Sequence, residues 1–238
     1  MRIEEPLRHF LAEQKICSPR RSYNFLDRNT VTVNGIRIAD WNHPIVPERD
    51  SVAVNGVPVP GPVHTYLMLN KPVGYVCSTV SDRSPTVFSL LEEKYSSLFT
   101  VGRLDKDSEG LIILTDNGWF SHYLTSPDAG ISKTYEVELE TGISPWQQHE
   151  YTECFRTGIT LPEEKKGKAF VSRSALLEWQ DSFHCTVTLE EGKFRQVRRM
   201  FAAMGNCVIR LRRKKIGPWE LDAALGPGEY RKFNPFYL

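Results

Sequence analysis

The 238-residue sequence lacks the features of several protein classes. No apolar run approaches the roughly 18 residues of a membrane-spanning helix, and the start, MRIEEPLRHF, has no apolar signal-peptide core. The five cysteines are scattered and odd in number, and no C-x-x-C pair is present, which argues against a disulfide framework and a zinc site. The sequence also offers neither a Gly-rich dinucleotide loop nor a metal cluster. We therefore expect a cytoplasmic protein that uses no metal and no cofactor.

Positive charge is concentrated toward the C-terminal end. The net charge of +1 by itself says nothing about nucleic acid. From Lys193 to Lys215, however, there are nine Lys or Arg residues and no Asp or Glu. A basic block of this size is typical of a phosphate-binding surface. Taken alone, it would equally fit a solvated helix face.

The stretch 101–118, VGRLDKDSEGLIILTDNG, predicts a buried strand with a polar turn on each side. Residues 111–114 are apolar and partly β-branched, and residues 115–118 form a turn signal. Asp105 would then stand on a loop at the mouth of the strand, where a rigid element can position a functional side chain. Alternatively, Asp105 and Asp107 are ordinary turn formers beside an arginine.

The sequence divides into two predicted domains joined by a linker. Residues 1–58 contain two short helical patterns and then two Asn-Gly hairpin signals between alternating apolar residues. Residues 59–64 are the linker, because three prolines within 58–62 favour an extended spacer over a strand ladder. Residues 65–238 form the second domain, in which alternating strand patterns are mixed with helices.

The segment that ends at Gly205 predicts a helix with two distinct faces. At about 100° per residue, one apolar stripe belongs to the core, and its members are Val197, Met200, Phe201 and Met204. Arg195 and Arg199 point nearly opposite, toward solvent or RNA. Arg198 lies roughly 90° from the stripe, where a side chain can reach from the core edge into a partly buried pocket. Otherwise Arg198 is an ordinary surface arginine.

Residues 102–105 (Gly-Arg-Leu-Asp), 107–111 and 114–118 resemble the signature of bacterial ribosomal-RNA pseudouridine synthases of the RsuA group. The resemblance covers nearly the whole chain. It implies an α+β fold, with a small S4-like RNA-binding domain followed by a synthase domain whose mainly antiparallel, mixed central sheet is flanked by helices. In that family the aspartate of the first motif is catalytic, and this residue is Asp105 here.

Two further segments resemble the other motifs of the family. Residues 133–135 (Lys-Thr-Tyr) match the second motif, whose tyrosine packs on the target uracil; read alone, Tyr135 is a core tyrosine. An aromatic ring suits that role because every base offers a π-face. Residues 195–198 are similar to the third motif, in which the position of Arg198 supplies the cation that pairs with the catalytic aspartate. Such a pair would keep Asp105 ionised in a partly buried site.

The resemblance also implies a set of cations that contact RNA. We expect phosphate or other RNA contacts that set register without reading sequence from Arg20, Arg21, Lys71, Arg103, Arg195, Arg199 and Arg210. Lys71 is equally compatible with a plain turn lysine. The N-terminal segment departs from the family at residues 4–6 (Glu-Glu-Pro) and at Pro19, so a weakened RNA contact of this domain is one expectation.

Together these patterns predict an isomerase that converts one uridine of ribosomal RNA into pseudouridine. Residues 77–79 and 125–127 resemble small-subunit members and favour 16S rRNA, whereas residues 106–108 also occur in large-subunit members and keep 23S rRNA as the alternative. The main rival from another class is a non-catalytic S4-type RNA-binding protein with a retired active site. The expected partner is ribosomal RNA, and the expected state is a monomer that does not bind membranes.

Overall fold

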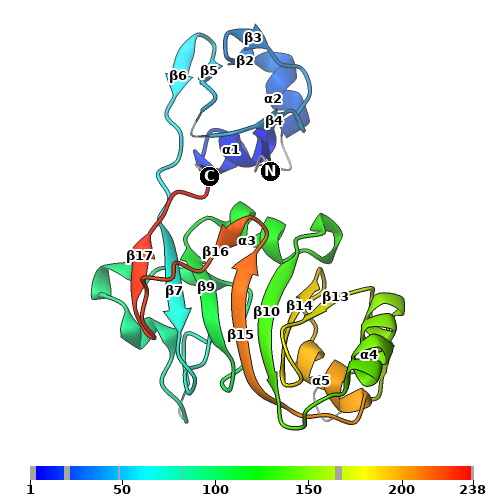
Figure 1. Cartoon of the computed structure of the whole chain (residues 1–238). Helices are drawn as coiled ribbons and strands as arrows, with labels where there is room; N and C mark the ends of the chain where they lie inside the picture. The colour runs from blue at the N-terminus through cyan, green and yellow to red at the C-terminus, as the bar shows by residue number, and fades with distance from the viewer. Residues whose placement is uncertain (1–3, 19–21, 48, 82, 164–167, 237–238) are drawn as a thin grey trace. The chain divides into compact units, whose positions relative to one another are not determined.

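The structure, a computed structural model, describes residues 4–18, 22–47, 49–81, 83–163 and 168–236. The chain forms two compact units, drawn in Figure 1. The first contains residues 4–64 together with 234–236, and the second contains residues 65–233. The sequence places the end of the second domain at residue 238, whereas the final described residues group with the first unit. There the carbonyl of Phe236 accepts a hydrogen bond from Arg49 Nη2 at 2.9 Å.

The first unit combines two short helices with a four-stranded sheet of order β3-β2-β5-β6. Its elements are β1 (Glu5–Pro6), α1 (Leu7–Glu13), α2 (Ser22–Arg28), β2 (Val31–Val33), β3 (Ile36–Arg37), β4 (Pro44–Ile45), β5 (Val52–Val54) and β6 (Val57–Val59). Both predicted Asn-Gly turns are present, because Asn34 and Asn55 adopt the left-handed conformation that such turns require, with φ of 52° and 53°. The sequence predicts that the prolines within 58–62 oppose a strand ladder, but Pro58 pairs with Ala53 in edge strand β6, the sheet position that tolerates proline.

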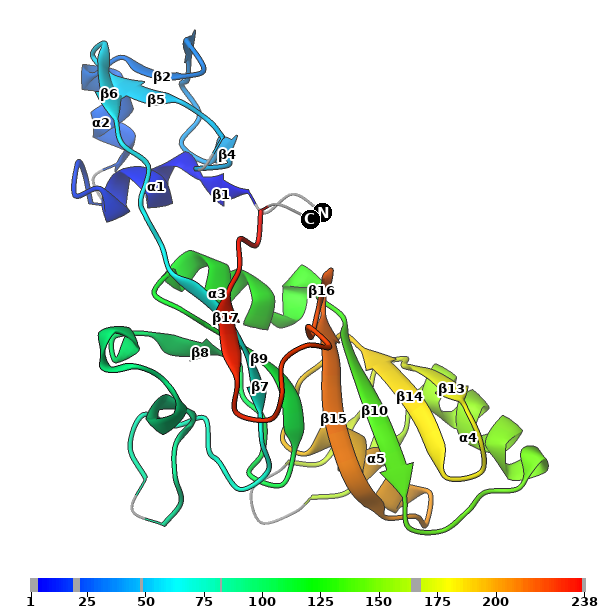
Figure 2. The same ribbon diagram turned by 60° about the vertical axis from the view of Figure 1, so that its left-hand side comes forward.

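The second unit is built on one mixed sheet of order β13-β14-β10-β15-β9-β7-β17 (Figures 1 and 2). Its strands are β7 (Tyr66–Lys71), β8 (Phe99–Val101), β9 (Glu109–Thr115), β10 (Lys133–Leu139), β13 (Leu176–Trp179), β14 (His184–Leu189), β15 (Val208–Ile216), β16 (Trp219–Glu220) and β17 (Tyr230–Lys232). Along this order, over the part of the chain that the structure describes, only β15 and β9 run parallel. The predicted mixed, mainly antiparallel sheet is therefore confirmed.

Helices and a small hairpin complete the second unit. They are η1 (Val87–Leu90), η2 (Glu93–Tyr95), α3 (Gly118–Thr125), η3 (Pro127–Ala129), α4 (Pro145–Thr157), β11 (Thr160–Leu161), β12 (Phe170–Val171) and α5 (Gln196–Ala203). Helices α4 and α5 lie on the same face of the sheet (Figure 2). Three of the four residues of the predicted apolar stripe enter the core: Val197, Met200 and Phe201 are at most 4% exposed, whereas Met204, just after α5, is only partly buried.

Gly110 fixes the approach of β9 to β15. The run Leu111–Leu114 on β9 is fully buried between β7 and β15. Gly110 precedes this run with φ of +101°, and a Cβ there would lie 2.3 Å from the carbonyl oxygen of Arg213 on β15. A side chain cannot occupy that space, and the conformation itself favours glycine. This contact therefore determines where the loop that precedes β9 lies against β15.

Replacing Gly110 with alanine should destabilise the protein, because the new Cβ must push β15 away from β9 and adopt a strained φ. We expect Gly110→Ala to lower the free energy of unfolding by about 2 kcal/mol or more. Gly118→Ala is the matched control, since nothing lies within 4 Å of a Cβ at this first residue of α3. Denaturant unfolding of both variants measures the difference; equal stabilities would show that β9 and β15 can separate freely.

Candidate active site

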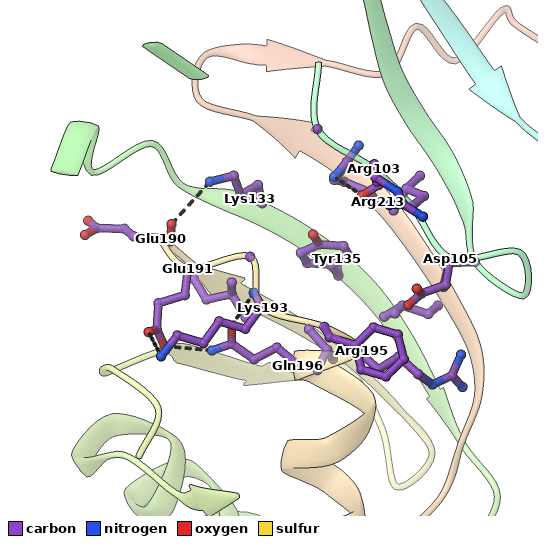
Figure 3. Close-up of a pocket in the computed structure, with 18 of the residues that line it drawn as sticks. Arg103, Asp105, Lys133, Tyr135, Glu190, Glu191, Lys193, Arg195, Gln196 and Arg213 are labelled. Atoms are coloured by element: carbon purple, nitrogen blue, oxygen red, sulfur yellow. Dashed lines mark hydrogen bonds and ion pairs between the residues drawn. The ribbon is translucent and has the colours of Figure 1, made fainter. Parts of the chain in front are cut away.

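The second unit contains a cavity of about 650 Å³ against β10 and β15, two inner strands of the central sheet (Figure 3). Arg103 and Asp105 enter it from the loop between β8 and β9. Lys133 and Tyr135 enter from β10, and Arg213 enters from β15. Residues of the segment 189–197, from the end of β14 to the start of α5, line the other side. Segments far apart in the sequence thus meet around one space.

The loop that carries Asp105 is held by its backbone. Gly74 N donates to the carbonyl of Lys106 at 2.8 Å, and Ser108 N donates to the carbonyl of Asp105 at 3.1 Å. One residue earlier, Leu104 N lies 3.4 Å from the Sγ of buried Cys77 and donates to it. The carboxylate of Asp105 itself has no hydrogen bond or ion pair with the described residues. The backbone of Asp105 is therefore held in place, and its uncoordinated side chain lines the cavity.

Tyr135 lies in the floor of the cavity. It occupies β10 between Val187 on β14 and Arg213 on β15, and its exposed fraction is only 8%. Figure 3 shows its ring between Lys133 and Asp105. A nearly buried aromatic ring in a polar cavity offers a flat apolar surface on which a base can stack. The structure thus brings Asp105 and Tyr135 to the same space, as the sequence predicts.

Arg198 is placed differently from the prediction. It pairs with Asp107 rather than with Asp105: Nη2 donates to the Asp107 carbonyl at 2.8 Å, and Nε lies 3.5 Å from Asp107 Oδ2. Its Nη1 donates to the carbonyl of Val208 at 2.6 Å. The predicted direct ion pair is therefore wrong. Helix periodicity predicts that Arg198 lies at the core edge, and its side chain is 11% exposed, but periodicity cannot tell which of two aspartates in one short turn will face it.

The pKa values of this pair follow from burial and charge. Burial lowers the pKa of Arg198, although the carboxylate of Asp107 opposes that effect. Burial alone would raise the pKa of Asp107, but hydrogen bonds from Arg195 and the charges of Arg198 and Arg195 outweigh it and hold that pKa below its usual value. Asp107 is therefore the ionised partner of both arginines.

Two predicted RNA contacts are contradicted by burial. Lys71 is 0% exposed, and its Nζ donates to the carbonyls of Ser108 at 2.6 Å and Pro72 at 3.0 Å. Burial accordingly lowers the pKa of Lys71. Arg199 is 4% exposed because residues around the β11–β12 hairpin cover it: its Nη2 donates to the carbonyls of Pro162 and Lys168. Neither side chain can reach RNA without leaving these acceptors.

The other predicted contacts have varied positions. Arg103 and Arg195 line the cavity, whereas Arg210 is exposed elsewhere and pairs with Glu109 at 2.6 Å. Arg20 and Arg21 lie outside the described residues. Sequence reasoning did not name the cavity residues Lys133 and Arg173, and it included Lys193 and Arg213 only as members of the basic block 193–215. Lys133 could have been found, since residues two apart on a strand face the same side and Tyr135 was already selected.

The cavity carries an excess of positive charge. Its described lining contains six cations (Arg103, Lys133, Arg173, Lys193, Arg195 and Arg213) and three carboxylates (Asp105, Glu190 and Glu191), an excess of three. Such a surface attracts an anionic substrate such as a nucleic-acid backbone. Over the same described ranges, no group of three or more metal-binding side chains gathers. No helix there has the length and apolar character to span a membrane.

Known proteins are similar to this chain over nearly its whole length. Ribosomal small subunit pseudouridine synthase A of Escherichia coli (strain K12) is 41% identical over 226 residues, which is 93% of each chain. The protein of the same name from Pasteurella multocida (strain Pm70) is 37% identical over 227 residues, 94% of each. A crystal structure of a pseudouridylate synthase superposes with a TM-score of 0.67 and 34% identity, covering 97% of this chain and 96% of the other.

The family comparison agrees with these relatives. The sequence model described as RNA pseudouridylate synthase matches residues 65–203, which include both the loop of Asp105 and the strand of Tyr135. The match spans more than half of the chain, and the expectation of an isomerase is confirmed. The chain belongs to the RNA pseudouridylate synthase family.

Proposed function

We propose that this protein converts a uridine of small-subunit ribosomal RNA into pseudouridine, with Asp105 as the catalytic residue and Tyr135 as the platform for the target base. The observation that carries the assignment is the uncoordinated carboxylate of Asp105 beside the ring of Tyr135 in one cation-rich cavity. The relatives named above act on the small ribosomal subunit, which supports the choice of RNA. We keep large-subunit RNA as the alternative that the experiment must test.

The side chains of the cavity match the requirements of pseudouridine formation. Pseudouridine formation breaks the C1′–N1 bond of uridine, turns the base and joins C1′ to C5, so no net oxidation or reduction occurs. The base must first leave its stack, and a flat ring such as Tyr135 compensates for the lost stacking. Asp105 then acts as a nucleophile or as the base that removes a sugar proton. Either role needs a carboxylate without a competing partner, and Asp105 has no hydrogen bond or ion pair with the described residues.

The cations of the cavity fit the RNA backbone. Lys133 donates from Nζ to the carbonyl of Glu190 at 3.2 Å and has no carboxylate partner among the described residues. Burial and the nearby charge of Arg213 lower the pKa of Lys133, so an added phosphate would relieve the repulsion between these two cations. We propose that Lys133, Arg103 and Arg173 hold phosphates near the target nucleotide and set its register.

Asp105→Asn should abolish catalysis while RNA binding persists, because the amide keeps the size of the side chain and removes its negative charge. We expect the rate of pseudouridine formation to fall on the order of a thousandfold or more. The measurement is pseudouridine mapping in rRNA of cells that carry wild type, the variant or no protein. Asp222→Asn, outside the cavity lining, is the matched control. Undiminished modification by Asp105→Asn would refute the assignment, and wild-type modification confined to large-subunit RNA would refute the target.

Two substitutions of Tyr135 should separate the contribution of ring stacking from that of the phenolic hydroxyl. Tyr135→Leu removes the flat ring, and we expect KM to rise by about ten- to a hundredfold, since stacking on one base is worth roughly 1–3 kcal/mol. Tyr135→Phe keeps the ring, so KM should stay near wild type and any loss should appear in kcat. Steady-state kinetics on the RNA give both values. The platform role fails if leucine and phenylalanine have the same KM.

A further inference from the structure

The two aspartates of the loop between β8 and β9 have opposite surroundings. Asp105 faces the cavity without a partner among the described residues. Asp107, two residues later, forms a two-pronged ion pair with Arg195, in which Nη1 lies 3.0 Å from Oδ1 and Nη2 lies 2.8 Å from Oδ2. This parallel geometry is the strong and orientationally specific form of a guanidinium–carboxylate contact. It links residues 88 positions apart in the chain.

Arg198 reinforces the same link from inside the protein. Its Nη2 donates to the backbone carbonyl of Asp107, and its Nη1 donates to the carbonyl of Val208 at the start of β15. The side chain of Arg198 is only 11% exposed, whereas that of Asp107 is 45% exposed. The loop is therefore joined to α5 by one largely buried arginine, Arg198, and one partly exposed arginine, Arg195.

The backbone of Arg195 is also unusual. Arg195 precedes the first turn of α5 with φ of +48°, a left-handed conformation that arginine rarely adopts. Neighbouring contacts hold this turn: Lys193 N donates to Gln196 Oε1 at 3.1 Å, and Gln196 Nε2 donates to buried Glu191 at 2.7 Å. Figure 3 shows the Arg195 side chain extending along the side of the cavity where Asp105 lies. Strained backbone conformations of this kind concentrate at functional sites.

We propose that Asp107, Arg195 and Arg198 form a clasp that positions the catalytic Asp105, an inference that rests on the proposed role of Asp105. The clasp does two things. It fixes the loop against α5, so that the carboxylate of Asp105 is held where the target sugar and base arrive. It also engages both guanidinium groups with Asp107, and neither of them bonds to the carboxylate of Asp105. Asp107 is a positioning residue, since it acts through Asp105 and does not line the cavity.

An alternative to the clasp is that Arg195 binds an RNA phosphate directly. The two roles predict different kinetics. Loss of a phosphate contact weakens RNA binding, raises KM and reduces the salt dependence of binding by about one phosphate. Loss of positioning lowers kcat, because a misplaced carboxylate reacts slowly even when RNA is fully bound. The partner at the other end of the contact, Asp107, cannot bind phosphate at all.

A double-mutant cycle tests the clasp with Asp107→Asn, Arg195→Gln and the combined variant. We expect each single variant to lose on the order of ten- to a hundredfold in kcat, with KM changed less than about threefold. The combined variant should be no slower than the slower single variant, because both changes break the same contact. Asp107→Glu, which keeps the charge, should recover part of kcat.

Three controls distinguish failure of the clasp from a wrong RNA target and from unfolding of a variant. Asp222→Asn removes the carboxylate of a similar exposed ion pair, with Arg231 Nε at 2.6 Å, and should keep the wild-type kcat. The cycle is run on whichever ribosomal RNA the wild type modifies, so a wrong choice of RNA refutes the target and leaves the clasp measurable. Unfolding curves show whether each variant is folded at the assay temperature. Losses that multiply in the combined variant, or a rise in KM for Arg195→Gln alone, would overturn the clasp.

Discussion

The close parallel contact between β9 and β15 is the constraint on which the site depends. Gly110 has no Cβ to keep the backbones apart, and Arg213 stands directly against it. Arg213 Nε donates to the carbonyl of Leu111 at 2.8 Å, so the side chain repeats the link that the backbone makes. Because the loop of Asp105 leads into β9 and Tyr135 lies on the other neighbour of β15, this one contact sets the distance between acid and ring.

Backbone acceptors organise the surrounding charges. Buried Lys71 and Arg199 are held by main-chain carbonyls, and Arg198 is held mainly in the same way. Carbonyls fix a cation without cancelling its charge, so the region around the cavity remains positive while its side chains stay ordered. A catalytic pocket for RNA needs both properties, since it must attract phosphate and hold its reacting groups still.

The sequence predicted those features that depend on local pattern. Strand β9, the apolar stripe of α5 and the shared cavity of Asp105 and Tyr135 follow from periodicity and from recognisable motifs. The errors concern partners that come from distant segments. Arg199 lies on the polar side of α5, but the region of the β11–β12 hairpin covers it, and no pattern within α5 reveals that cover. Which aspartate contacts Arg198, Asp105 or Asp107, likewise depends on the three-dimensional course of the loop.

The half-exposed pair of Asp107 with Arg195 ties the site to ionic strength. At physiological salt the Debye length is about 8 Å, and contacts open to solvent weaken further as salt is added. Dissolved ions should therefore have two effects: they screen the proposed attraction between the cavity and the RNA backbone, and they weaken the ion pair that holds the loop of Asp105. Arg198 is largely buried and donates to main-chain carbonyls, so salt weakens its contacts less, and they limit how far that loop can move.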